Sequence, residues 1–173
     1  MTDQVVAARA ALHMWEEPCI SGKKGSGAVF FSGCPLQCVF CQNRPIALGK
    51  AGKEISVQRL ADIFLELRDQ GANNINLVTP THFVPQIIEA VRRARAAGLS
   101  IPIVYNTGSY ENPETISMLE GTADIFLPVL TGVYFDDGNM ITTDRFRLTK
   151  VKYDNEGFKA LIPGGVMRSF ATG

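Results

Sequence analysis

The sequence predicts an α/β protein whose parallel strands form part of a (β/α) barrel. Short apolar runs alternate with amphipathic helical segments up to residue 128, and this alternation stops after Pro128. Strands that alternate with single helices form a parallel sheet with right-handed crossovers. In barrels of this kind the chemistry lies at the C-terminal ends of the strands. We therefore expect a core of about four βα units at residues 1–128 and a divergent extension at 129–173.

The first βα unit has the clearest local signals. AVFFS at residues 28–32 is short, apolar and partly β-branched or aromatic, which is typical of a buried strand. From Ser56 to about Gln70, apolar residues recur at helical spacing. Ser56 suits the N-terminal cap of this helix and Gly71 its C-terminal end. The first 26 residues are mixed, and we assign no element to them.

Three further strands are expected, with a helix between each pair. A helix from about Val84 ends near Gly98, and a shorter one opens at Asn112 and Pro113 and ends near Glu120. The strands are expected at residues 74–79, 101–105 and 123–127.

The last 45 residues do not continue the alternation of strand and helix patterns. FDDGNM (135–140) is typical of a hairpin turn between two strands, and YDNEGF (153–158) is typical of a second. We expect an irregular, β-rich tail. A fragment, a rearranged gene product and a chain completed by a partner remain open as interpretations of it.

Composition limits the classes of function. The 17 basic residues balance the 17 acidic ones, so neither nucleic acid nor an anionic membrane is expected as the main partner. We find no run of apolar residues long enough to cross a bilayer and no signal peptide. We therefore expect a cytoplasmic protein, in whose reducing environment four cysteines indicate metal or redox chemistry.

Three of the cysteines follow the first predicted strand in one short loop. Cys34, Cys38 and Cys41 have the spacing C-x3-C-x2-C. Thiolates hold iron–sulfur clusters, usually with one cysteine per iron. Three ligands on a four-iron cluster leave one iron open to an external ligand, so the loop predicts a catalytic [4Fe–4S] cluster.

Two other readings of this loop remain open. A structural zinc site needs a fourth ligand, which would have to be Cys19, His13 or His82. Alternatively, the three thiols are inert and buried. Cys19 lies outside the triplet, where a small buried hydrophobic residue is its expected role.

The loop resembles that of the radical S-adenosylmethionine (SAM) superfamily, in which an aromatic residue precedes the third cysteine, as Phe40 does here. The resemblance implies that the open iron binds the amino and carboxylate groups of SAM. It also implies that an electron from the cluster cleaves SAM to a 5′-deoxyadenosyl radical, which abstracts a hydrogen atom from the substrate. In such enzymes the cofactors supply the chemistry and the protein orients them.

A longer resemblance, over about residues 8–128, is to the pyruvate formate-lyase activating enzyme-like branch of this superfamily. The similar segments are residues 13–22, 25–43, 75–87 and 101–107. The resemblance implies a glycyl-radical enzyme as the protein substrate and a flavodoxin- or ferredoxin-type electron donor.

The resemblance also implies further contacts with SAM. Thr79 and Thr81 occupy the place where the superfamily usually has a Gly-Gly-Glu segment that meets the SAM amino group, and His82 follows them. Asn106 ends the strand expected at 101–105, near where the ribose and carboxylate of SAM should lie. From the residues alone, Asn106 is equally well a turn former and His82 a helix-start residue.

The sequence also departs from this branch. The branch has an Asp-x-Lys shortly after the Leu-Pro that ends at Pro128, and here both charges are missing. The superfamily barrel normally has about six βα units, against the four counted here. Glu16 and Glu17 match the branch without an evident role. Two alternatives to an enzyme therefore remain: a silent Fe–S or electron-transfer module and a zinc-stabilised interaction domain.

Overall fold

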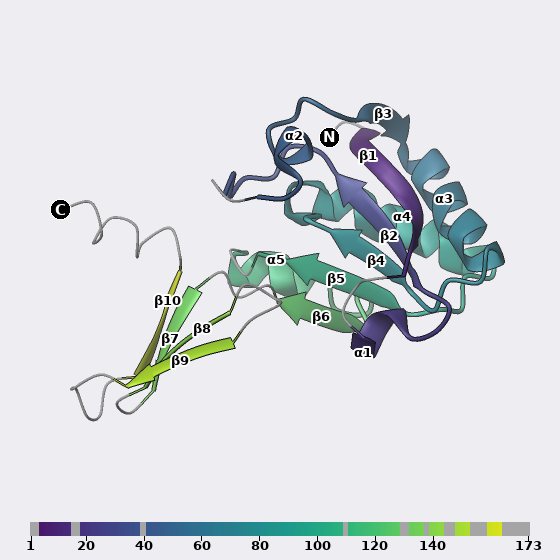
Figure 1. Cartoon of the computed structure of the whole chain (residues 1–173). Helices are drawn as coiled ribbons and strands as arrows, with labels where there is room; N and C mark the ends of the chain where they lie inside the picture. Colours follow the sequence, from purple (N-terminus) through teal and green to yellow (C-terminus); the bar gives the residue numbers. More distant parts are fainter. Residues whose placement is uncertain are drawn as a thin grey trace. The chain divides into compact units, whose positions relative to one another are not determined.

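The structure is a computed structural model. It describes residues 4–14, 18–38, 41–108 and 111–128, and the backbone of four strands at 132–136, 139–143, 148–152 and 159–163. The chain divides into two compact units, Met1–Leu127 and Pro128–Gly173, and each is considered by itself (Figure 1).

The first unit is built on a six-stranded sheet. Its strands are β1 (Gln4–His13), β2 (Ser26–Phe31), β3 (Lys53–Ser56), β4 (Ile75–Val78), β5 (Ile103–Thr107) and β6 (Ile125–Pro128). Their order across the sheet is β3-β1-β2-β4-β5-β6. The neighbouring strands β2, β4 and β5 pair in parallel, and β6 runs in the same direction in Figure 1.

Two long helices and several short ones connect these strands. They are α1 (Pro18–Ser21), α2 (Arg44–Ala47), α3 (Val57–Asp69), the 3₁₀ turn η1 (Thr81–Phe83), α4 (Val84–Ala96) and α5 (Pro113–Met118). Ser56 caps α3 by accepting a hydrogen bond from the backbone N–H of Arg59 at 3.1 Å. Gly71, which follows this helix, has φ +90°, a conformation that glycine adopts without strain.

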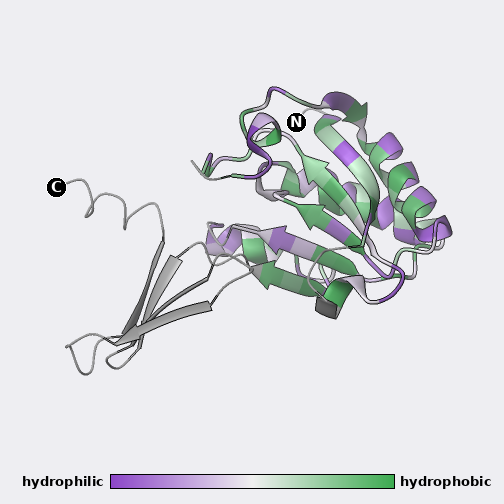
Figure 2. Cartoon of the chain, in the orientation of Figure 1, coloured by the Kyte–Doolittle hydropathy of each residue, from purple (hydrophilic) through white to green (hydrophobic). Residues whose placement is uncertain are grey.

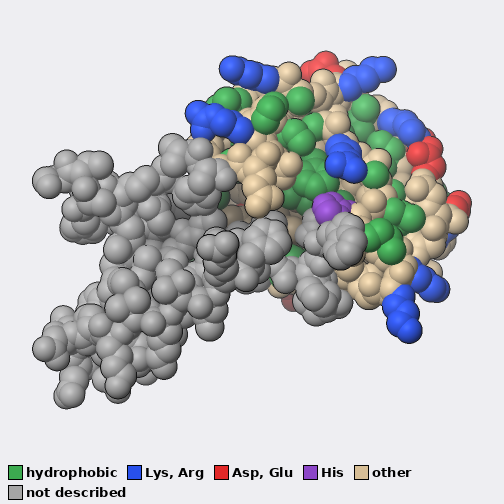
Figure 3. Space-filling model, in the orientation of Figure 1, with side chains coloured by type: hydrophobic (Ala, Val, Ile, Leu, Met, Phe, Trp, Pro, Cys, Tyr) green, Lys and Arg blue, Asp and Glu red, His purple; other side chains and the backbone are tan. Residues whose placement is uncertain are grey.

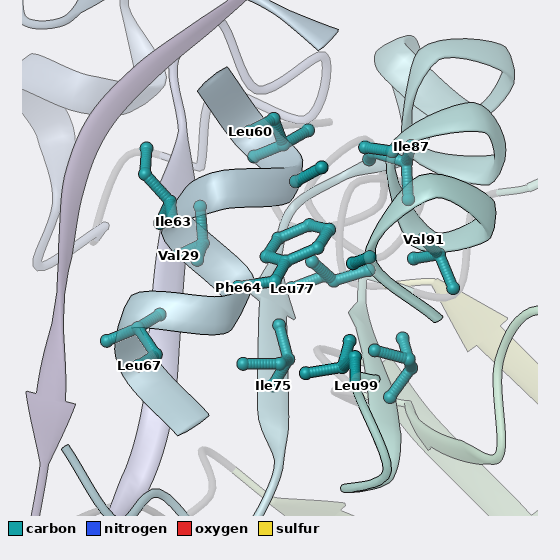
Figure 4. Packing of buried hydrophobic residues seen from close by; sticks show 14 of the residues in the cluster. Val29, Leu60, Ile63, Phe64, Leu67, Ile75, Leu77, Ile87, Val91 and Leu99 are labelled. Carbon is teal, nitrogen blue, oxygen red and sulfur yellow. The ribbon is translucent and has the colours of Figure 1, made fainter. Parts of the chain in front are cut away.

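The hydrophobic core lies between one face of the sheet and the helices α3 and α4. Figure 4 shows side chains from both helices meeting those of the strands around Phe64. The helices are amphipathic, with apolar residues toward the sheet and polar residues on the outside (Figure 2). The buried members of this cluster include Val29, Leu60, Phe64, Leu67, Ile75, Leu77, Ile87 and Val91. This packing decides which side chains of each strand face the helices.

The opposite face of the sheet has a different lining. Successive side chains of a strand point to opposite faces. Because Ile75 and Leu77 pack under the helices, Asn76 and Val78 lie on the other face of β4, where Val78 packs with Phe30. The view in Figure 3 shows hydrophobic side chains near the centre of the first unit, and its Lys and Arg side chains lie mostly, but not entirely, toward the margin.

The predicted alternation of strands and helices is confirmed, but the sheet also contains two strands, β1 and β3, that the sequence did not predict. β2, β4, β5 and β6 follow the chain order, but β1 pairs antiparallel with both β2 and β3. The sheet is therefore mixed rather than wholly parallel. Among the described strands β3 and β6 are its two edges, so the structure shows an open α/β sheet, and the barrel stays a prediction.

Strand β5 begins two residues later than expected. Residues 101–105 were assigned from their apolar pattern, but Pro102 has no N–H to donate to a neighbouring strand. Its carbonyl instead accepts from the N–H of Ile75 at 2.8 Å, and the strand starts at Ile103.

The second unit contains a four-stranded antiparallel sheet, which is more regular than the expected tail. Its strands are β7 (Gly132–Asp136), β8 (Asn139–Thr143), β9 (Leu148–Lys152) and β10 (Lys159–Pro163) in the order β10-β7-β8-β9. The hairpin predicted around 135–140 is confirmed, because β7 pairs with β8. The second hairpin is wrong, because β10 pairs with β7 and not with β9.

Within the part of the chain that the structure describes, none of the helices has the length and apolar character that crossing a bilayer requires.

The core predicts a large effect for one substitution. Phe64 is fully buried, so Phe64→Ala is expected to lower the free energy of unfolding by about 3–5 kcal/mol. Chemical denaturation followed by circular dichroism measures it. Ile116→Ala, at a side chain that is 39 % exposed, is the control and should change stability by about 0.5 kcal/mol or less. Equal losses in the two variants would contradict the packing described here.

Candidate functional site

The carboxyl ends of the parallel strands meet at one edge of the sheet. The register pairs Phe30 of β2 with Val78 of β4, and Val78 with Asn106 of β5. Just beyond, the N–H of Thr79 donates to the carbonyl of Asn106 at 3.0 Å. Residues that follow these three strands are therefore neighbours, although more than 20 positions separate them in the sequence.

The cysteine loop leaves this edge directly after β2 and is closed at its base. The N–H of Gly33 donates to the carbonyl of Ile46 in α2 at 2.9 Å, and the hydroxyl of Ser32 donates to the carbonyl of Ala51. Gly33 has φ +89°, which lets the chain turn sharply away from the strand. The loop therefore starts and ends at the same place on the sheet.

The loop extends toward β5. A Cβ added to Gly108, which follows β5, would lie only 2.1 Å from Cδ1 of Leu36, so the backbone there is in close contact with the loop. Leu36 lies between Cys34 and Cys38. The cysteine loop thus begins at the end of β2 and reaches the end of β5, at the carboxyl edge of the sheet, as expected.

The three thiols suit a cluster chemically. Cys34, Cys38 and Cys41 are not in disulfides and are only partly buried, as metal-binding cysteines that a cofactor must reach should be. In the described residues, no three Cys, His, Asp or Glu side chains are already gathered closely enough for a metal ion. The loop supplies the donor set, and its side chains would converge when a cluster binds, as commonly occurs when metal binding is coupled to folding.

Two residues with unusual backbone geometry also lie at this edge. Among the described residues, Gln37 and Thr79 are the ones other than glycine with positive φ, at +42° and +54°. Such conformations cost about 1–3 kcal/mol, most of all for a β-branched residue such as Thr79. They persist only where the surrounding contacts enforce them, and they concentrate at functional sites. Both coincide with segments that the sequence predicted to be functional.

The turn after β4 is tied to its neighbours through side chains. Thr81 donates to Oε1 of Glu111 at 2.6 Å, and Thr107 donates to the same oxygen. The hydroxyl of Tyr105 lies 3.5 Å from it. Burial raises the pKa of Tyr105 to about 12, although its hydrogen bond with Thr81 acts in the opposite direction. Tyr105 therefore stays neutral at physiological pH.

His82 links the same turn to β2. Its Nε2 lies 2.7 Å from the carbonyl oxygen of Ser32, just before the cysteine loop. Because a carbonyl oxygen only accepts, Nε2 carries the proton in this contact. The ring of His82 also lies against that of Phe83, with 4.2 Å between ring centroids. Of the histidines considered as zinc ligands, His82 is the one at the cysteine end of the sheet.

The other two candidate fourth ligands lie at the opposite end of β2. His13 pairs with Ser26, the first residue of that strand. Cys19 belongs to α1, which is tied to the segment before β4 by a 2.7 Å hydrogen bond from Asn74 to the carbonyl of Ile20. A six-residue strand is roughly 20 Å long, so neither residue can share a metal with Cys34.

Two buried amides lie on the sheet face opposite the helices. Asn76 is fully buried in β4, and neither atom of its amide has a hydrogen-bond partner within the described part of the chain. Asn106 lies on the same face of the neighbouring strand. A buried, unpaired amide costs about 1–3 kcal/mol, so this face offers polar groups that a bound molecule would satisfy.

The structure brings together most, but not all, of the predicted site residues. Cys34, Cys38, Cys41, Thr79, Thr81 and Asn106 lie at one edge of the sheet. Phe40, Glu16 and Glu17 lie outside the described residues, as does the side chain of Cys19. Glu111 was missed, because it belongs to no motif and its partners are distant in the sequence.

The comparison with known families agrees with this geometry. Residues 28–155 match the radical SAM superfamily. The chain belongs to this superfamily. Its members use a [4Fe–4S] cluster and SAM.

One curated relative is much longer than this chain. The uncharacterized protein MJ0674 of Methanocaldococcus jannaschii is 30 % identical over 125 residues, which are 67 % of this chain and 35 % of that protein. The chain thus spans about a third of this relative. No solved structure matches the chain significantly.

The site makes a direct prediction about metal content. After anaerobic reconstitution, replacing Cys34, Cys38 or Cys41 with Ala should abolish iron binding, which is about four irons per chain in the parent protein. Cys19→Ala and His82→Ala are the controls and should keep their iron. Iron and zinc analysis with the visible absorption spectrum measures this. Loss of metal in the His82 control, with zinc in the parent protein, would support the zinc reading instead.

Proposed function

We propose that this chain is the cluster- and SAM-binding part of a radical SAM enzyme that activates a partner protein. The observation that supports cluster and SAM binding is the loop after β2, whose three cysteines are not in disulfides and which lies beside the ends of β4 and β5. With Cys19 and His13 placed at the far end of the sheet, neither can act as a fourth ligand to the cluster. Three ligands leave one iron for SAM.

The residues around the loop have distinct roles in this proposal. Cys34, Cys38 and Cys41 would hold the cluster, which would supply the electron for reductive cleavage of SAM. Thr79, Thr81 and Asn106 orient SAM from the ends of β4 and β5. Phe40 packs against the bound cofactors. The apolar lining around Phe30 and Val78 keeps water from the reacting atoms.

A glycine of a glycyl-radical enzyme is the proposed substrate. The support is the sequence resemblance to activating enzymes over residues 8–128. An open sheet, whose described edges are β3 and β6, is also compatible with admitting a protein loop. A flavodoxin- or ferredoxin-type protein is the proposed electron donor, and the cytoplasm is the proposed location.

A zinc-stabilised interaction domain is the second candidate. It is favoured by the position of His82, which lies at the same edge as the three cysteines and hydrogen-bonds to Ser32. The absence of a gathered three-ligand group among the described residues is compatible with either metal. The two candidates differ in whether the loaded protein consumes SAM.

The test is SAM cleavage by the reconstituted, reduced chain. We expect 5′-deoxyadenosine to form in the parent protein and not in Cys38→Ser, which lacks one cluster ligand. When a candidate glycyl-radical enzyme is added, the EPR spectrum should show a glycyl doublet. Strong 5′-deoxyadenosine formation without a protein radical would redirect the substrate toward small molecules or peptides. No cleavage by an iron-loaded protein would contradict the proposed enzyme.

A further inference from the structure

Glu111 is at the centre of a hydrogen-bond cluster that joins two strand ends. Its Oε1 accepts from Thr81 at 2.6 Å and from Thr107, and the hydroxyl of Tyr105 lies 3.5 Å away. Thr81 follows β4, whereas Tyr105 and Thr107 belong to β5. One carboxylate oxygen therefore connects the segments that follow two neighbouring parallel strands.

Hydroxyl groups, and none of the described basic side chains, bind the carboxylate of Glu111. It is the sole acidic residue among the described positions that follow β2, β4 and β5 at this edge, namely 32–38, 41–52, 79–83, 108 and 111–112. None of the described Lys, Arg and His side chains forms an ion pair with it. Hydroxyl groups bind the carboxylate instead, and hydrogen bonds to an ionised acceptor are about twice as strong as neutral ones.

The cluster holds a turn whose backbone is strained. Thr79 has φ +54°, which a β-branched residue adopts only when its surroundings enforce it. Hydrogen bonds to neighbouring segments hold this turn. Thr79 donates from its N–H to Asn106 and from its hydroxyl to Phe31, His82 contacts Ser32, and Thr81 donates to Glu111. Among these contacts, the one with Glu111 reaches a residue that lies beyond the end of β5, whereas Asn106 and Phe31 belong to strands and Ser32 directly follows β2.

We propose that Glu111 is a positioning residue for SAM. It does not touch SAM in this proposal. It acts through Thr81 and Thr107, keeping the strained turn after β4 in register with the end of β5, where SAM is to be held. This inference rests on the function proposed above. Removing the carboxylate would let Thr79 relax and would separate the two segments that bind SAM.

The experiment compares four single variants of the reconstituted chain. Glu111→Ala removes the acceptor, Glu111→Gln keeps an uncharged one, and Thr81→Val removes only the donating hydroxyl. Glu114→Ala is the matched control, because Glu114 is an exposed acid three residues away in α5. Iron content, the dissociation constant of SAM by titration, and the SAM-induced change in the EPR spectrum of the reduced cluster are measured for each.

We expect Glu111→Ala to keep its iron and to raise the dissociation constant of SAM by about tenfold or more, as is typical when a residue supporting the ligand-binding groups is removed. Glu111→Gln should recover part of the affinity, and Glu114→Ala should match the parent protein. Thr81→Val should show a similar loss. The double variant Glu111→Ala/Thr81→Val should lose less than the sum of the two single losses, because both remove the Thr81–Glu111 contact.

A second measurement does not require SAM or the cluster. Hydrogen exchange of residues 79–83 in the chain without cofactors should be faster in Glu111→Ala than in Glu114→Ala, because the turn has lost one of its ties. Unchanged exchange would overturn the role of Glu111. So would parent-like SAM affinity in Glu111→Ala. If the parent protein itself fails to bind SAM, the proposed function fails, and this inference with it; a parent protein that binds SAM equally well with and without Glu111 overturns this inference alone.

Discussion

The parallel register of β2, β4 and β5 is the constraint on which the rest of the first unit depends. A shift of one residue along β4 would turn Ile75 and Leu77 away from α3 and α4 and expose the core. The packing of the helices therefore fixes the register. With Val78 opposite both Phe30 and Asn106, the three strands end together, and every segment that follows them starts from the same edge.

That edge contains features that a protein without a ligand-binding role has no reason to keep. The two non-glycine residues with positive φ among the described positions, Gln37 and Thr79, both lie there. Glu111, whose carboxylate accepts hydrogen bonds from the hydroxyl groups of Thr81 and Thr107, also lies there, and a fully buried amide at Asn76 lies two residues before the edge. Each of these costs free energy, which the helix–sheet core offsets. Strain and unsatisfied polar groups concentrated at one place are what a preorganised binding site requires.

The sequence predicted what depends on local pattern and missed what depends on distant partners. The helix from Ser56 and the strand over residues 28–32 were recognised because capping and apolar runs are local signals. β1 was missed because QVVAARAALH mixes small, polar and apolar residues, as suits a strand that is only partly buried. Turn residues at 153–158 suggested a local hairpin, whereas β10 pairs with a strand more than 20 residues earlier. Glu111 gave no signal, because its role exists only once β4 and β5 are side by side.

The central claim is that the chain holds an iron–sulfur cluster through three cysteines and leaves one iron open to SAM. Mössbauer spectroscopy of the reconstituted chain, with and without SAM, tests it most directly, because it resolves the ligand environment of individual irons. The account predicts that SAM alters the signal of one iron in four and leaves the other three unchanged. Four irons that do not respond to saturating SAM would contradict it, since they would show a cluster whose coordination is already complete.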